Sequence, residues 1–410
     1  MQRLSALLNR RIVPALTAFS DHTALSAIRT GMVSVVPLTI IGGLFMVIAY
    51  LPLPAWQRLV EPHLQLLQIP VTATFGLLGL VACLTIAYDL GTRLRQEPII
   101  SATMAAVVFM LIQVEPADLT FRTPGLGSQG LFPAILVALV VVWTQAFFTR
   151  RGIVITMPET VPSVVAQSFL SLVPLLVLVV SVWAIRFIAG VDINHVVQQA
   201  FAPLVFALNT LPGILVYAFL VSLLWSVGIH GDNALDAIVA PIFLQYLAEN
   251  VTAMSAGQPL PYVTANGFFT TFVNVGGTGA TLALALILAG SKDPGFRQVG
   301  RLSLPTQVFQ INEPIFFGLP IVLNPVFMVP YVVSALVLTT GSYLLMSWGL
   351  VQRPFVNVPW TTPPVIGHYL VTGGDWRAAV WGIVSLLIAL AIYYPFAKAA
   401  ERARRATGGV

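Results

Sequence analysis

Long apolar segments separated by short polar connections run along almost the whole chain. In the first half they cover residues 32–53, 72–90, 98–114, 131–149 and 168–189. In the second half they cover residues 212–229, 236–248, 268–290, 326–349 and 378–397. Because about 20 apolar residues span the hydrocarbon core of a bilayer, the pattern predicts an all-α polytopic membrane protein with about ten transmembrane helices.

A shorter stretch between the two halves has a different pattern. Within residues 193–208, apolar side chains recur at helical spacing and polar ones lie between them. We interpret the stretch as an amphipathic connecting helix on the outer surface, over residues 193–210. It divides the chain into a first half with five predicted spans (1–192) and a second half (211–410).

Composition and charge support the membrane interpretation. The chain of 410 residues is 57% hydrophobic and 9% charged, with a mean hydropathy of +0.89, whereas a soluble domain carries about 25% charged residues. The basic residues gather at the ends of alternate apolar segments, as at Arg3, Arg10 and Arg11, at Arg93 and Arg95, and after Lys398. This distribution predicts cytoplasmic N- and C-termini, and it explains the net charge of +5 without a nucleic-acid partner.

The same topology singles out residues 305–323. If both termini are cytoplasmic, this region must enter and leave the membrane on the same side. It contains Pro305, Pro314, Gly318 and Pro320, which interrupt helical hydrogen bonding. Irregular backbone at membrane depth is tolerated only where protein or a water-filled cavity satisfies it, and it often marks a transporter's binding site.

Two ionisable residues in the apolar second half are the main candidates for chemistry, because such residues are costly in a membrane. His230, between Gly228 and Gly231, can form a hydrogen bond or take up a proton. Its structural alternative is a helix-end histidine satisfied by a backbone carbonyl. Glu313, before Pro314, can accept hydroxyl protons or act as a base. Its alternative is an interior salt bridge or a helix cap.

Four further residues stand beside these candidates. Asn274 lies in a glycine-rich break that could expose backbone amides to a ligand, or simply permit close helix packing. Trp225 and Trp360 could each stack on a sugar ring, although tryptophan is also a common interfacial anchor. Asp232 could influence substrate choice or cap the following helix.

Several classes of function lack their usual motifs. The sequence has no phosphate-binding loop and no zinc-protease or serine-hydrolase motif. Its single cysteine, Cys83, lies in an apolar run, so the chain can form no internal disulfide and no cysteine-rich metal site. We therefore expect no metal and no cofactor.

Two motifs resemble one known family. These are GIHG at residues 228–231 and NEPIFFGLPIVLNP at residues 312–325, supported by residues 27–31, 37–42, 360–364 and 372–377. They are similar to the membrane permease (IIC) component of the lactose/cellobiose (diacetylchitobiose) group of the bacterial phosphoenolpyruvate-dependent phosphotransferase system. The resemblance extends almost from end to end, apart from Asp232, where a neutral residue is expected.

The resemblance implies a fold and a site. It implies a homodimer of chains with ten spanning helices and two re-entrant hairpins. The first five helices would form the dimerisation scaffold, and the second half would carry the sugar in an elevator-like movement. His230 and Glu313 would hold the sugar near its 6-hydroxyl, with further contacts from Asn312, Asn274, Asp232, Trp225 and Trp360.

The resemblance also implies partners. A disaccharide such as cellobiose or diacetylchitobiose would be phosphorylated by a separate IIB protein, itself supplied by IIA and HPr. This chain would carry no phosphorylated residue of its own, and would act in the lipid of the inner membrane as a subunit of the transferase complex. Two alternatives remain: an ion-coupled sugar symporter, and a polytopic enzyme acting on lipid-linked sugars.

Overall fold

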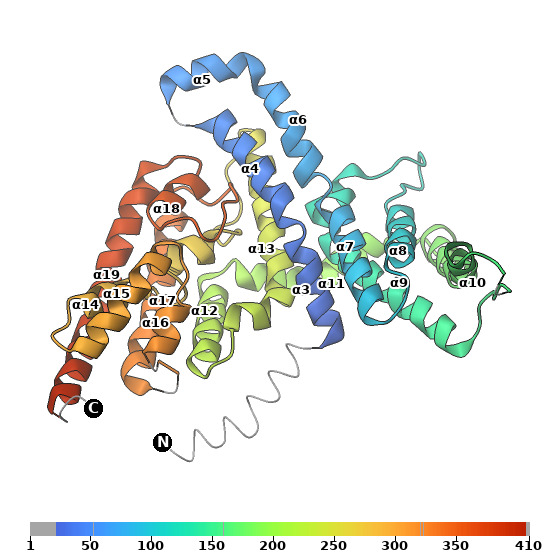
Figure 1. Cartoon of the computed structure of the whole chain (residues 1–410). Helices are drawn as coiled ribbons and strands as arrows, with labels where there is room; N and C mark the ends of the chain where they lie inside the picture. Colours follow the sequence, from blue (N-terminus) through green and yellow to red (C-terminus); the bar gives the residue numbers. More distant parts are fainter. Residues whose placement is uncertain (1–21, 52, 159, 320, 323, 407–410) are drawn as a thin grey trace.

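The computed structural model describes residues 22–406, except 52, 159, 320 and 323, and it is built of helices (Figure 1). The helices of the first half are α3 (Thr23–Val33), α4 (Val36–Tyr50), α5 (Pro54–Val60), α6 (Leu64–Phe75), α7 (Leu78–Arg93), α8 (Pro98–Ile112), α9 (Leu131–Arg151) and α10 (Ser163–Trp183). Those of the second half are α11 (Ile193–Leu208), α12 (Leu211–Ser226), α13 (Gly231–Ser255), α14 (Leu282–Ala289), α15 (Pro294–Val308), α16 (Glu313–Gly318), α17 (Pro325–Ser347), α18 (Ile366–Val371) and α19 (Trp376–Ala406).

The described residues contain seven helical segments long and apolar enough to cross a membrane, or eight if the bent pair α11 and α12 counts as one span. The predicted all-α polytopic class is therefore confirmed. The count of ten spans stays a prediction, since α8 has only 15 residues and the pair α11 and α12 is bent by 82°. The connecting helix predicted from residue 193 corresponds to α11. The basic residues Arg3, Arg10 and Arg11, used to predict orientation, lie outside the described residues.

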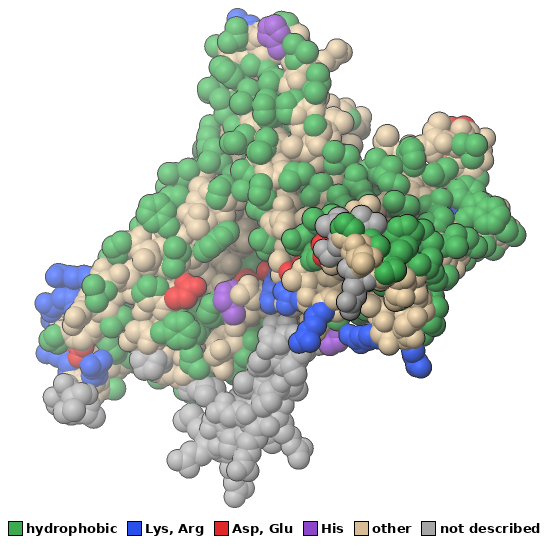
Figure 2. Space-filling model, turned by 45° about the vertical axis from the view of Figure 1, so that its right-hand side comes forward, with side chains coloured by type: hydrophobic (Ala, Val, Ile, Leu, Met, Phe, Trp, Pro, Cys, Tyr) green, Lys and Arg blue, Asp and Glu red, His purple; other side chains and the backbone are tan. Residues whose placement is uncertain are grey.

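Apolar side chains cover the flanks of the molecule. In the span Ala166–Ile188, only 11% of the apolar window is buried, so nearly the whole helix is left for lipid or for another protein surface. Figure 2 shows hydrophobic side chains over most of one face, with most of the basic side chains in its lower half. This separation is typical of a protein whose flanks face hydrocarbon.

Close helix packing builds the core of the first half. Helix α7 packs against α3, α8 and α9, and its inward face carries Ala82, Cys83 and Ile86, all fully buried. A Cβ atom on Gly31 of α3 would lie 2.3 Å from Cγ1 of Ile86, so only glycine allows the two helices to approach this closely.

A polar cluster joins the chain just after α8, the π-helical turn that follows α10 (Ala184–Ile188) and the start of α11, at one end of the first half. The buried guanidinium of Arg186 donates two hydrogen bonds, of 3.0 and 2.7 Å, to the carbonyl oxygen of Val114. It also forms an ion pair with Asp192 at 3.4 Å, and Arg122 forms another at 3.2 Å. Asp192 in turn caps α11 by accepting a hydrogen bond from the backbone N–H of His195. One carboxylate therefore fixes the start of the connecting helix.

The second half departs from the prediction in two places. The apolar segment predicted as one span over 268–290 is interrupted at 274–281, leaving a π-helical turn (Phe268–Val273) and the short helix α14. Helix α14 then forms a hairpin with α15 through a turn at 290–293. Pro305 lies inside α15, so the break predicted from residue 305 begins only at 309. Helix α15 continues beyond this proline because it packs against α14 in the hairpin. The local sequence does not predict this continuation.

Polar contacts connect the two halves. The side-chain amide of Asn357 donates to the hydroxyl of Thr39 on α4 at 2.5 Å and accepts from the amide of Asn266 at 3.0 Å. A Cβ atom on Gly43 would lie 3.0 Å from both the backbone N and O of Asn357. Near the start of α13, Arg29 of α3 donates to the carbonyl of Asn233 at 3.0 Å. These contacts pack the second half against α3 and α4.

Candidate functional site

The GIHG motif forms the tight connection between α12 and α13. Gly228 has φ +89°, in the left-handed region that favours glycine, and it turns the chain away from the end of α12. His230 caps α13: its Nδ1 atom accepts the backbone N–H of Asn233 at 3.3 Å, while its ring remains exposed. A Cβ on Gly231 would lie 2.3 Å from the carbonyl oxygen of Val221, so this glycine lets α13 begin directly against α12.

Trp225 lies at the centre of the site. Its ring centroid lies 4.2 Å from that of His230, with the planes at 45°, and 5.1 Å from that of Phe316 in an edge-to-face contact. Trp225 is buried, whereas His230 is exposed. Since Phe316 belongs to α16, which begins at Glu313, the tryptophan brings the two predicted chemical groups into one cluster.

Asp232 joins this cluster to the interrupted segment. Its Oδ2 atom accepts a hydrogen bond from Nε1–H of Trp225 at 2.8 Å and another from the hydroxyl of Thr278 at 3.2 Å. The carbonyl oxygen of Thr278 accepts a hydrogen bond from the side-chain amide of Asn312 at 3.0 Å. A continuous chain of hydrogen bonds therefore runs from Trp225 to Asn312, the residue before Glu313.

Glycines shape the loop that carries Thr278, over residues 274–281. Gly276, Gly277 and Gly279 all have positive φ angles, between +76° and +102°. The backbone N–H groups of Gly276 and Gly277 both donate to the Oε1 atom of Gln310, at 2.7 and 3.0 Å. A Cβ atom on Gly277 would lie 2.6 Å from the Cβ atom of Asn312, so the loop and the start of α16 touch without space for a side chain.

Glu313 occupies the first position of α16, with Pro314 after it, and its side chain is exposed. No salt bridge involves Glu313 among residues 22–406 as described, so the interior ion pair considered as its alternative gains no support. The neighbouring Asn312 is buried, and its amide is already engaged with Thr278. An exposed carboxylate beside an anchored amide can accept hydrogen bonds from a ligand.

The two remaining predicted residues differ from each other. Asn274 is buried at the start of the glycine loop, and its Oδ1 atom has no hydrogen-bond partner within the described part of the chain. Trp360 lies in the connection between α17 and α18 with 59% of its surface exposed. Hydrogen bonds and ring contacts join four of the predicted residues, His230, Trp225, Asp232 and Asn312. Glu313 follows Asn312 in the chain, and Asn274 lies in the same loop as Thr278. Among the described residues, no hydrogen bond or ring contact joins Trp360 to this cluster.

Three residues of the site were not predicted. Thr278 and Gln310 hold the glycine loop, and Phe316 packs against Trp225. Both polar residues stand beside predicted ones in the sequence, in the runs that contain Asn274 and Asn312. That proximity was the only available signal, because threonine, glutamine and phenylalanine in an apolar segment are otherwise typical packing residues.

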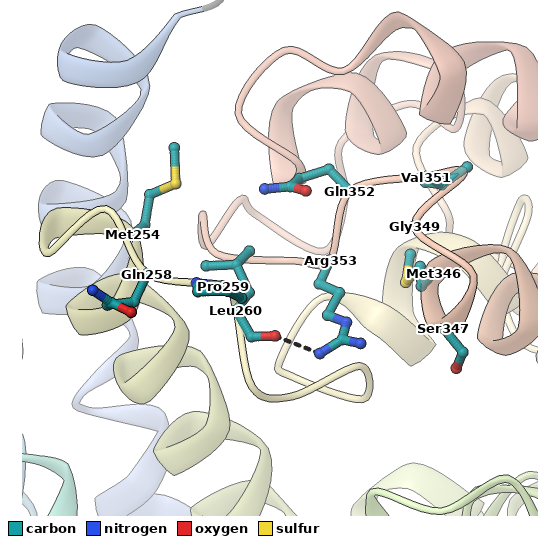
Figure 3. A pocket seen from close by; sticks show the side chains of 10 residues that line it. All are labelled: Met254, Gln258, Pro259, Leu260, Met346, Ser347, Gly349, Val351, Gln352 and Arg353. Carbon is teal, nitrogen blue, oxygen red and sulfur yellow. Dashed lines mark hydrogen bonds between the residues drawn. The ribbon is translucent and has the colours of Figure 1, made fainter.

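A separate cavity of about 250 Å³ lies at the far end of α13 (Figure 3). Its lining comes from the C-terminal ends of α13 and α17 and from the loops after them, including Met254, Gln258 and Gln352. Arg353 lies at its wall and donates to the carbonyl oxygen of Leu260. Since α13 has 25 residues and a helix rises 1.5 Å per residue, roughly 35 Å separates this cavity from His230. The cavity is not part of the site.

Comparison with known proteins agrees with these features. The family described as "Phosphotransferase system, EIIC" matches residues 29–335. The putative permease IIC component YwbA of Bacillus subtilis (strain 168) is 36% identical over 423 residues, which cover 97% of this chain and 95% of that protein. The cellobiose-specific EIIC component of Geobacillus stearothermophilus is 35% identical, over 97% of this chain and 94% of that protein.

A solved structure has the same fold. It is the crystal structure of the transporter ChbC, the IIC component of an N,N'-diacetylchitobiose-specific phosphotransferase system. It is 33% identical in sequence and superposes with a TM-score of 0.92, over 98% of this chain and 100% of that one. These matches confirm the resemblance seen in the GIHG and NEP motifs, and the chain belongs to the EIIC family of phosphotransferase-system permeases.

Proposed function

We propose that this permease takes up a β-linked disaccharide, such as cellobiose or diacetylchitobiose, and presents its 6-hydroxyl for phosphorylation by a separate IIB protein. The carrying observation is the hydrogen-bonded chain through Asp232, Thr278 and Asn312, which brings the neighbourhoods of His230 and Glu313 into one cluster. The substrates for which two relatives are named, cellobiose and N,N'-diacetylchitobiose, support the choice of sugar.

Family membership itself gives the broader setting. A permease of this family is a multi-pass protein of the bacterial inner membrane, with a sugar substrate and a soluble IIB partner. It does not support the ion-coupled symporter considered as an alternative. We further propose IIA and HPr as the proteins that supply phosphate to IIB, a homodimer held by residues 1–192, and cytoplasmic termini.

The proposed chemistry uses the two exposed groups of the site. The oxygen of the sugar 6-hydroxyl attacks the phosphorus of the phosphocysteine on IIB, so that an O–P bond forms and the S–P bond breaks. Glu313 accepts the hydroxyl proton, as a carboxylate general base does. Because Nδ1 of His230 accepts the backbone N–H of Asn233, Nε2 is the ring atom available to the same hydroxyl. Positioning by these groups accounts for catalysis, as in other phosphoryl transfers.

The remaining predicted residues bind the sugar in this proposal. The unpaired oxygen of Asn274 accepts a sugar hydroxyl, and the faces of Trp225 and Trp360 line the rings. Asn312 completes the polar wall, and Asp232, predicted as a further sugar contact, is directed instead to partners within the protein.

The test is uptake of radiolabelled cellobiose and diacetylchitobiose into sealed vesicles, with and without phosphoenolpyruvate and the purified soluble partners. We expect sugar phosphate to accumulate only with phosphoenolpyruvate, and to be lost in Glu313→Gln and His230→Ala. Free sugar accumulating under an ion gradient alone would overturn the proposal. Accumulation of a phosphate of only one sugar would identify the substrate.

A further inference from the structure

We propose that Asp232 is a positioning residue, which fixes His230 and Glu313 relative to each other through neutral hydrogen-bond donors. The proposal rests on the function proposed above for these two groups. It differs from the role of sugar contact first predicted for Asp232, because it assigns the carboxylate to partners within the protein. This side chain belongs to α13 and bonds directly to α12 and to the glycine loop, and Thr278 of that loop connects it to the start of α16.

On one side, Asp232 acts on His230 through Trp225. The 2.8 Å hydrogen bond from Nε1–H fixes the rotation of the indole, which is 96% buried and held on its other side by Phe316. The indole face then limits where the exposed imidazole of His230 can lie, since the ring centroids are 4.2 Å apart. A buried ring thereby transmits the constraint from the carboxylate to the exposed histidine.

On the other side, Asp232 acts on Glu313 through two links. The hydroxyl of Thr278 donates to the same Oδ2 atom, and the carbonyl of Thr278 accepts from the amide of Asn312. Asn312 immediately precedes Glu313 and stands at the N-terminus of α16. Gly277, which contacts Asn312, leaves no gap in which this linkage could adjust.

Helix capping alone does not account for these contacts. A carboxylate in the first turn of α13 is favoured by the helix dipole whichever way its side chain points. The cap itself is supplied by His230. Both hydrogen bonds of Asp232 instead lead away from its own helix, to α12 and to a loop 46 residues further along the chain. Charge-assisted bonds of this kind are stronger than neutral ones.

The variants Asp232→Asn and Asp232→Leu test this role. Asparagine has the same shape and keeps an acceptor oxygen for both donors, whereas leucine fills the space and accepts neither bond. We expect kcat/KM for phosphoenolpyruvate-dependent sugar phosphorylation to fall by no more than about threefold in Asp232→Asn, and by about 30-fold in Asp232→Leu. Equal losses in both variants would show that the negative charge acts directly, and would overturn the proposal.

A background that lacks both donors separates positioning from sugar contact. In Trp225→Phe/Thr278→Val, Asp232 has lost both of its bonds, so the further change Asp232→Leu should cost less than about threefold. A direct contact with the sugar would make that change as costly in this background as in the wild type, and would contradict the proposal. Asn233→Ala is the matched control, because this exposed neighbour makes its contacts through the backbone.

Two further measurements keep the test independent of transport. Equilibrium binding of the same radiolabelled sugars to the purified permease, without IIB, should show the same non-additivity even if the proposed phosphorylation fails. The ¹⁵N-labelled indole N–H of Trp225, assigned by its loss in Trp225→Phe, should shift in Asp232→Leu and remain near its place in Asp232→Asn. An unchanged signal in Asp232→Leu would overturn the proposal without any ligand.

Discussion

The indole of Trp225 packs against the imidazole of His230, with ring centroids 4.2 Å apart and planes inclined at 45°. The two residues lie on opposite sides of the Gly228 turn, so the contact closes the connection between α12 and α13. It couples a buried aromatic ring to the exposed group that we propose to act on the sugar. Several measurable consequences follow from this and from three other relationships in the structure.

Replacing Trp225 should separate its two roles. Trp225→Phe keeps an aromatic ring against His230 and Phe316 but loses the bond to Asp232, and we expect sugar phosphorylation to fall about tenfold. Trp225→Ala also removes the ring contacts, and we expect a loss of about 100-fold. Trp183→Phe, on the outward-facing surface of α10, is the control. If Trp225→Phe and Trp225→Ala are equally impaired, the ring has no role beyond its N–H group.

Substitution of Gly277 should lower the phosphorylation activity of the permease. In Gly277→Ala the new Cβ would lie 2.6 Å from the Cβ of Asn312, at a residue with φ +102°. We expect sugar phosphorylation to fall at least about 100-fold, because the loop must move away from α16. Initial phosphorylation rates of the purified variant measure this.

The control for that variant also places alanine at a positive φ angle, but without the clash. Gly257 has φ +66° and open space around the position of a Cβ atom. Gly257→Ala should cost about 1–2 kcal/mol of stability, the penalty for alanine in the left-handed region, and leave phosphorylation unchanged. Equal loss of activity in both variants would attribute the effect of Gly277→Ala to strain alone.

Asp192 should make the first half sensitive to acid. Partial burial raises the pKa of Asp192, but the backbone N–H of His195 and the charges of Arg122 and Arg186 outweigh this and hold the pKa below its ordinary value of 3.8. The folded state therefore binds this proton less readily than the unfolded state. The resulting stability is present above pH 4 and is lost as the pH falls below it.

Two substitutions separate the ion pairs from the helix cap. Asp192→Asn keeps a good capping side chain but removes the charge opposite the buried Arg186, and should cost about 1–2 kcal/mol at pH 7. Asp192→Ala also loses the cap, at a further cost of about 1 kcal/mol. Thermal unfolding in detergent at pH 7, 5 and 3.5 should show the gap between wild type and Asp192→Asn beginning to narrow at the lowest pH. A gap that does not depend on pH would contradict the assignment.

The contact between Thr39 and Asn357 offers a test of the elevator movement. The two side chains meet at 2.5 Å across the boundary between α4 and the second half. In the double variant Thr39→Cys/Asn357→Cys, bridging by Hg²⁺ should stop uptake almost completely, since the second half could no longer move along α4. The native chain has one cysteine, the buried Cys83, so Cys83→Ser gives a clean background and single cysteine variants serve as controls. Undiminished uptake in the bridged protein would exclude a movement that separates this pair.

Much of the fold could be predicted because a membrane leaves few choices. Backbone polar groups must be satisfied within each segment, so long apolar runs become helices, as α4, α9, α17 and α19 do. The amphipathic spacing from residue 193 marked α11 for the same reason. The site motifs were also visible, because His230, Asp232 and Glu313 are costly residues in an apolar chain and are therefore conspicuous.

The sequence by itself determined the helical membrane class, the connecting helix and which polar residues to suspect. Only the tertiary structure decided that the break at Asn274 divides residues 268–290 into a π-helical turn and α14, and that α15 continues past Pro305. It also decided that Trp225, Asp232, Thr278 and Asn312 form one hydrogen-bonded chain. The bonded donors and acceptors lie up to 46 residues apart, and the side chains meet only because α12, α13 and the hairpin pack together. The spacing of apolar residues along the sequence predicts which face of each helix is buried. It does not predict which distant polar groups form hydrogen bonds, because these pairs depend on how the helices pack together.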